Sequence, residues 1–141
     1  MAKATYFANA STIAGLDAAL ATIGSGAKLR IYSGTVPADA DTALGAQVQL
    51  AELSMSATPF AGATDGTGKA TATANAITGA AAGATGTASF FRILTSGGVA
   101  KVQGTCGTSD ANCILPTTAI ESGVTVNVTS LTVEQPELST A

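Results

Sequence analysis

The chain contains no histidine and no tryptophan, and its aromatic residues are limited to four phenylalanines and two tyrosines. The absence of histidine excludes Ser–His and Cys–His dyads, which removes the commonest hydrolytic mechanisms. Nine carboxylates remain, but they are dispersed. The closest pair, Asp39 and Asp41, is typical of a solvated turn, since a calcium loop needs about six or more oxygen ligands. We therefore expect no enzymatic activity, no metal and no cofactor, and an enzyme that uses carboxylates alone ranks last.

Charged residues are also scarce, at 11% of the chain, and the net charge is −3. The six basic residues are scattered, so nucleic acid is not expected as a partner. No apolar run is long enough to cross a membrane, and the first residues lack the layout of a secretory signal. These absences predict synthesis in the cytoplasm, no membrane partner, and an uncharged surface that is covered in an assembly.

Small residues dominate what is present, with 30 alanines, 22 threonines and 16 glycines among the 141 residues. An alanine buries little area, whereas a buried Val, Leu, Ile or Phe contributes roughly 1.5 to 3 kcal/mol. The composition therefore predicts a thin core and a modest stability that association with another protein would increase.

Residues 1–27 are predicted to form an N-terminal arm with a short helix. Ser11 is placed to cap a helix with one apolar stripe, and the Gly-Ser-Gly run at residues 24–26 ends it. Two roles for this arm stay open: it anchors a partner, or its helix covers one open end of the β region. The arm residues predicted to contact a partner are Tyr6, Phe7, Ile13, Leu16 and Leu20.

Residues 28–136 contain about seven short β-favouring segments separated by Gly-rich and Pro-containing turns, and residues 137–141 form a C-terminal tail. The apolar residues change parity near Ala51 and again at Thr129 and Ser130, which predicts a bulge at each place. This pattern favours an all-β fold, an antiparallel β-sandwich of jelly-roll type with a short N-terminal helical arm.

The segment at residues 86–107 carries the bulkiest run of the chain, FFRIL, followed by a Ser-Gly-Gly turn that predicts a hairpin. Alternation places Phe90 on the face of Arg92, and Phe91 on the opposite face. The second face therefore needs a cover, from this chain or from another. Arg92 is either a solvated strand residue or a contact to a partner.

Cys106 and Cys113 flank the segment GTSDAN and would lie opposite one another in a symmetric hairpin. A disulfide is then geometrically possible. Two small buried thiols are the favoured alternative in a reducing compartment, and a metal site is weaker still, since two thiols without histidine do not fill a tetrahedral shell.

The order of segments resembles a known family over about residues 28–136. The segments are YSGTVPADAD, ALGAQVQLAELSMS, GTASFFRIL, VQGTCGTSDANCIL and GVTVNVTSLTVEQP. In this order they are similar to the capsid decoration, or cement, proteins of tailed bacteriophages, a family of jelly-roll cementing proteins. The resemblance implies a noncatalytic clamp on the capsid exterior of the virion. It would bridge neighbouring subunits of the major capsid protein as a homodimer, with no small-molecule substrate.

A second function from a different class stays open. A sandwich of this kind also occurs in tail or adhesin-type binding modules that recognise a host surface glycan. Such a module needs exposed aromatic rings, and besides the phenylalanines only Tyr6 and Tyr32 could offer them.

Overall fold

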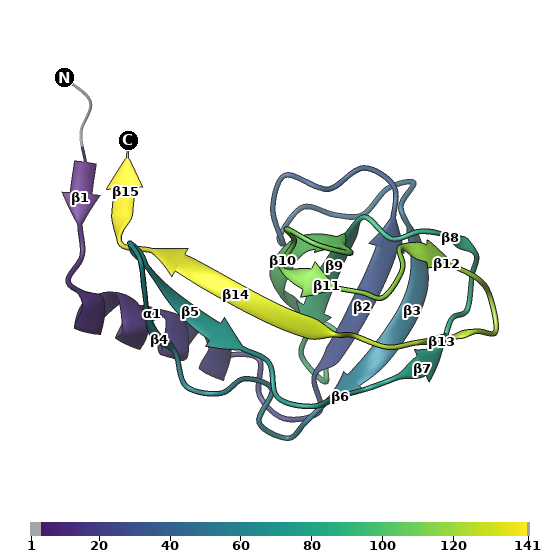
Figure 1. Ribbon diagram of the computed structural model, residues 1–141, viewed down its shortest axis with the longest axis horizontal. Helices are drawn as coiled ribbons and strands as arrows, with labels where there is room; N and C mark the ends of the chain where they lie inside the picture. Colours follow the sequence, from purple (N-terminus) through teal and green to yellow (C-terminus); the bar gives the residue numbers. More distant parts are fainter. Residues whose placement is uncertain (1–3, 141) are drawn as a thin grey trace.

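The structure, a computed structural model, describes residues 4–140 of the chain. Within these residues the regular elements are one helix and fifteen strands, so the all-β class is confirmed (Figure 1). In chain order the elements are β1 (Ala4–Tyr6), α1 (Asn9–Ala21), β2 (Lys28–Ser33), β3 (Val48–Met55), β4 (Thr64–Gly66), β5 (Lys69–Thr73), β6 (Ile77–Thr78), β7 (Ala80–Ala81), β8 (Gly86–Thr87), β9 (Phe90–Leu94), β10 (Ala100–Gly107), β11 (Cys113–Ile114), β12 (Ala119–Ile120), β13 (Thr125–Val126), β14 (Ser130–Pro136) and β15 (Leu138–Thr140).

Nine strands form one curled main sheet in the order β4-β5-β14-β11-β10-β9-β2-β3-β6 (Figure 1). Its pairings are antiparallel except for β10 with β11, which run parallel. The expectation of a purely antiparallel fold is therefore wrong at this pair. The chain leaves β10 at Gly107, makes a tight loop, and re-enters beside Cys106 in the same direction instead of turning back as a symmetric hairpin.

One segment joins the two sides of the curl. Residues 69–78 contain two strands, β5 and β6. β5 pairs with β14 on one side of the main sheet, whereas β6 pairs with β3 on the other side. Because only residues 74–76 separate these two strands, the sheet closes on itself around its inner face.

Two short ladders form a second, irregular layer against β3. β7 pairs with β13, and β8 pairs with β12, so residues 80–87 run antiparallel to residues 119–126. The backbone N–H of Gly83 donates to the carbonyl of Leu50 in β3 at 2.9 Å. The bulge predicted at Thr129 and Ser130 is instead a break between two strands, β13 in this layer and β14 in the main sheet.

The parity change near Ala51 is confirmed as an irregularity in the β2–β3 register. Ile31 is opposite Ala51, but the next residue of β2, Tyr32, is opposite Gln49. Leu50 is therefore the extra residue on β3, and both Leu50 and Ala51 are buried.

Helix α1 packs across β5 and β14 at one end of the curl (Figure 1). The predicted cap is wrong by a few residues: the helix begins at Asn9 after Ala8, and no side chain caps it. The close approach depends on small residues, since Ala70 and Ala72 of β5 are buried. A Cβ atom added at Gly15 would lie 3.2 Å from Nε2 of Gln135 on β14.

The apolar stripe of α1 belongs to the single core of the molecule. Leu16 and Leu20 are 5% and 8% exposed, and Ile13 is half-buried against the same cluster. Of the two roles left open for the helix, covering the β region is the one that the structure shows. The core also contains Phe91, whose ring lies over Gly104 of β10, where an added Cβ would approach ring atoms to 2.7 Å.

We predict that Leu16→Ala lowers the free energy of unfolding by about 3 kcal/mol, because it leaves a cavity between α1 and the sheet. The same substitution at Leu44, which is 37% exposed, should cost less than about 1 kcal/mol. Urea denaturation followed by circular dichroism measures both. If Leu16→Ala lowers the free energy of unfolding as little as Leu44→Ala does, the helix contributes little to the core.

Candidate interaction surface

The two ends of the described chain pair with each other. β1 and β15 form a two-stranded antiparallel ladder that we call the terminal ribbon, with Ala4 opposite Thr140 and Tyr6 opposite Leu138. The ribbon projects from the rest of the molecule beside α1 (Figure 1). The sequence offered no signal for it, since strands of three residues are too short to show alternation.

The base of the terminal ribbon is tied to the turn between β4 and β5. The N–H of Phe7 donates to the carbonyl of Glu137 at 2.8 Å, and the N–H of Glu137 donates to the carbonyl of Gly68 at 3.0 Å. Nδ2 of Asn9 donates to Oδ2 of Asp65 at 3.1 Å. These bonds fix the place at which the ribbon leaves the body.

Two aromatic side chains lie at this base and stay in solvent. Tyr6 is 77% exposed and Phe7 is 48% exposed, while the other four aromatic residues of the chain are buried. Exposed aromatic side chains are candidate contacts, because burying them in a partner removes apolar area from water. Of the six residues predicted to contact a partner, Tyr6 and Phe7 are therefore the two that the structure leaves mainly exposed.

Tyr32 is not available at the surface as an aromatic platform. It is 3% exposed, and its ring stacks on Phe90 with the centroids 5.0 Å apart. The two tyrosines therefore do not share an exposed face, and Tyr32 is not part of an aromatic platform for a glycan.

Arg92 lies on the outer face of β9 under a loop that we call the cover loop, residues 34–47. It is 6% exposed. Its Nη2 donates to the carbonyls of Thr42 at 2.6 Å and Asp39 at 3.1 Å, and its Nε donates to Oε1 of Gln103 at 2.9 Å. Nε2 of Gln103 in turn donates to the carbonyl of Pro37 at 2.8 Å. The outer face of the β9–β10 hairpin is thus covered by a loop of this same chain, and Arg92 holds that loop in place.

The two aspartates of the cover loop form a turn. Oδ1 of Asp39 accepts the hydroxyl of Thr42 at 2.7 Å, the N–H of Thr42 at 2.8 Å and the N–H of Asp41 at 3.0 Å. These bonds, that from the Thr42 hydroxyl first, lower the pKa of Asp39. Asp39 therefore organises the turn as an ionised acceptor.

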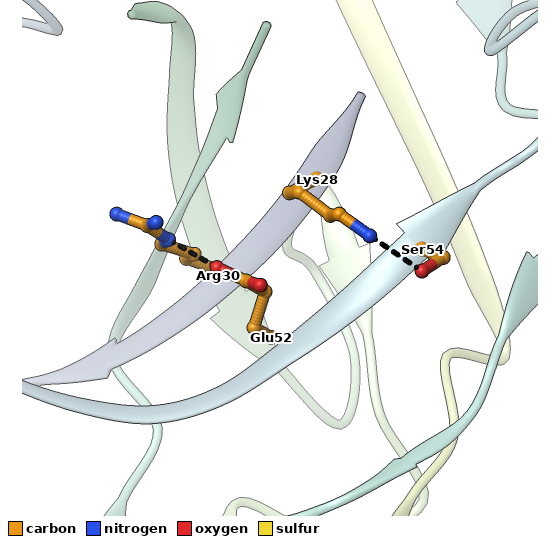
Figure 2. A network of polar contacts seen from close by, with 4 residues as sticks. All are labelled: Lys28, Arg30, Glu52 and Ser54. Carbon is orange, nitrogen blue, oxygen red and sulfur yellow. Dashed lines mark hydrogen bonds and ion pairs between the residues drawn. The ribbon is translucent and has the colours of Figure 1, made fainter. Parts of the chain in front are cut away.

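Arg92 is part of a polar row that crosses four strands. Gln103, Arg92, Arg30 and Glu52 are successive partners on β10, β9, β2 and β3. Figure 2 shows the far end of this row, where Nε of Arg30 lies 2.6 Å from Oε2 of Glu52, beside the bond at 2.9 Å from Nζ of Lys28 to Oγ of Ser54. Each arginine has its own acceptors, which offsets the repulsion between adjacent like charges.

The cover loop and its end also expose apolar side chains. Val36, Leu44 and Val48 are 42%, 37% and 47% exposed.

Within residues 4–140, no three His, Cys, Asp or Glu side chains gather as a metal site would require. In the same residues, no helix has the length and apolar character to span a membrane.

Comparison with known proteins gives no match: no known family, no curated protein and no solved structure is similar to this chain.

Glu137, at the base of the terminal ribbon, has a raised pKa. Partial burial, and then the negative charge of Asp65, raise the pKa of Glu137 above its ordinary value. A raised pKa means that the folded state binds the proton more tightly than the unfolded state does. The contribution of Glu137 to stability is therefore fully present below the unfolded pKa and is lost as the pH rises through the folded pKa.

We predict that Asp65→Asn lowers the pKa of Glu137 toward its ordinary value, because the neighbouring charge is removed. Carbon-detected NMR titration of the Glu137 carboxyl group measures this. Glu121→Gln, between β12 and β13 at the other end of the molecule, should leave the pKa of Glu137 unchanged (Figure 1). If neither substitution changes the pKa of Glu137, the charge of Asp65 does not raise that pKa.

We also predict that Arg92→Met lowers the free energy of unfolding by about 2 kcal/mol, because it removes the charged donors that hold the cover loop. Amide hydrogen exchange at residues 38–42 should speed up at the same time. The matched control is Arg30→Met, which breaks a half-exposed ion pair and should cost less than about 1 kcal/mol. Unchanged exchange in the cover loop would argue against Arg92 as its anchor.

Proposed function

We propose that the chain is a structural virion protein that decorates a bacteriophage capsid and cements it by bridging neighbouring subunits of the major capsid protein. The observation that carries the proposal is the terminal ribbon, which presents Tyr6 and Phe7 to solvent. The resemblance in the order of segments over residues 28–136 supports the same function. The low charge, 11% of residues, agrees with a surface that is covered in an assembly.

The proposed contact uses both the backbone and the side chains of the terminal ribbon. Because the ribbon has two strands, each of them has one edge without a strand partner. An edge of this kind can add a strand from another protein, while side chains at its base fill pockets in the partner. In the proposed complex, Tyr6 and Phe7 are these anchors.

The finer fold and the assembly state belong to the same proposal. The curled main sheet, with a second layer of short ladders against β3, supports a fold of the jelly-roll type. A homodimer on the capsid exterior would place one terminal ribbon on each of two neighbouring capsid subunits, which is what a bridge requires. The helix residues Ile13, Leu16 and Leu20 are in the core, and Arg92 holds the cover loop, so Tyr6 and Phe7 carry the proposed contact.

The test is binding to capsid shells that lack the protein. Purified wild-type chain should co-sediment with the shells, and the double variant Tyr6→Ser, Phe7→Ser should bind at least tenfold more weakly, because both apolar anchors are lost. Val99→Ser is the matched control, since Val99 is 56% exposed at the tip of the β9–β10 turn, away from the ribbon. Circular dichroism checks that each variant is folded.

Two outcomes would contradict the proposal. If the wild type does not bind shells but binds on a glycan array, the chain is a glycan-recognition module. If the double variant decorates shells as fully as the wild type does, the terminal ribbon is not the contact.

A further inference from the structure

Cys106 and Cys113 face each other across a short seam of the main sheet. They are Cα partners in the parallel pair of β10 and β11, which contains one further residue pair, Gly107 with Ile114. Neighbouring strands lie about 4.8 Å apart, within the range that the Cα atoms of a disulfide span. Both cysteines are free thiols in the structure. The register of the backbone thus permits a disulfide between these two residues.

The two thiols differ in access. Cys106 is half-buried, whereas Cys113 is fully buried. A reagent from solvent therefore meets Cys106 first, and Cys113 is placed to react with whatever forms there. This is the arrangement of an attacking and a resolving cysteine.

We propose that Cys106 and Cys113 are an oxidation site that forms an intramolecular disulfide, with a small disulfide such as glutathione disulfide as the oxidant. The Cys106 thiolate attacks one sulfur of the oxidant, the S–S bond of the oxidant breaks, and the first glutathione leaves and takes up a proton. The Cys113 thiolate then attacks the Cys106 sulfur, and the second glutathione leaves in the same way. The cysteines lose two electrons and two protons, and the oxidant becomes two thiols.

The environment of the pair makes this reaction slow. The hydrogen bond with Cys113, and then burial, raise the pKa of the Cys106 thiol above its ordinary value. Little thiolate is therefore present near neutral pH, and the thiolate is the reactive form. The pair survives brief contact with an oxidant and changes state on long exposure.

The new bond would strengthen the main sheet where it is held by few residues. The β10–β11 seam joins the strands around β14 to the strands around β9, and its ladder consists of two residue pairs. A bond from Cys106 to Cys113 closes the loop of residues 107–112. Because a closed loop restricts the unfolded chain, the melting temperature should rise by about 5 to 10 °C.

The experiment incubates the reduced, folded chain with excess glutathione disulfide at mildly alkaline pH. The expected product has an intact mass lower by two hydrogen atoms, has no thiol that can be alkylated after denaturation, and melts at a higher temperature until dithiothreitol is added. Cys113→Ala should stop at a stable glutathione adduct on Cys106. Cys106→Ser should keep its buried thiol free.

Any of three results would overturn the proposal. In the first, the wild type keeps both thiols during incubation. In the second, it stops at a glutathione adduct, which shows that Cys113 does not reach Cys106. In the third, the disulfide forms only after the chain is unfolded in urea. The wild-type mass decides the first two without any variant.

Discussion

The burial of β9 on both faces is the constraint on which the rest of the structure depends. The chain has few bulky side chains, and β9 carries a large share of them, with all five of its residues buried. Its inner face, with Phe91 and Ile93, requires the curl of the main sheet, the second layer and α1 to enclose it. Its outer face requires the cover loop, which stays in place because Arg92 and Gln103 donate to its carbonyls. The curl of the main sheet and the anchored cover loop both serve to bury the few bulky apolar side chains of the chain.

Small residues determine how closely these parts approach. Ala70, Ala72 and Gly15 let the helix lie against β5 and β14, and Gly104 makes room for the ring of Phe91. The alanine and glycine content that predicted a thin core is therefore also what permits tight packing between layers. In the residues that the structure describes, no buried side-chain N or O atom lacks a hydrogen-bond partner. The thin core is thus closely packed, and its buried polar atoms are hydrogen-bonded.

Local patterns in the sequence predicted local structure well. The all-β class, the irregularity near Ala51 and the two-sided hairpin around Arg92 follow from alternation, and the structure has them. Pairings between distant segments were not predictable. The parallel pairing of β11 and the assignment of β13 and β14 to different sheets depend on tertiary contacts that two or three residues do not encode. For the candidate site, side-chain bulk selected Tyr6 and Phe7, which are exposed, and also Leu16 and Leu20, which are buried, because an apolar stripe has the same sequence pattern whether it faces a partner or the core.

The terminal ribbon has a consequence for the order in which the molecule is built. Its two strands are separated by nearly the whole described chain, and α1 must also wait for β14 before its apolar stripe is covered. Contacts between such distant segments form late, because the intervening chain must first be synthesised and ordered. The strand edges and the base that present Tyr6 and Phe7 are therefore completed only once the main sheet has closed. A nascent or half-folded chain carries the two aromatic residues but not the rigid frame that holds them, so under the proposed function only the fully folded chain would present its contact.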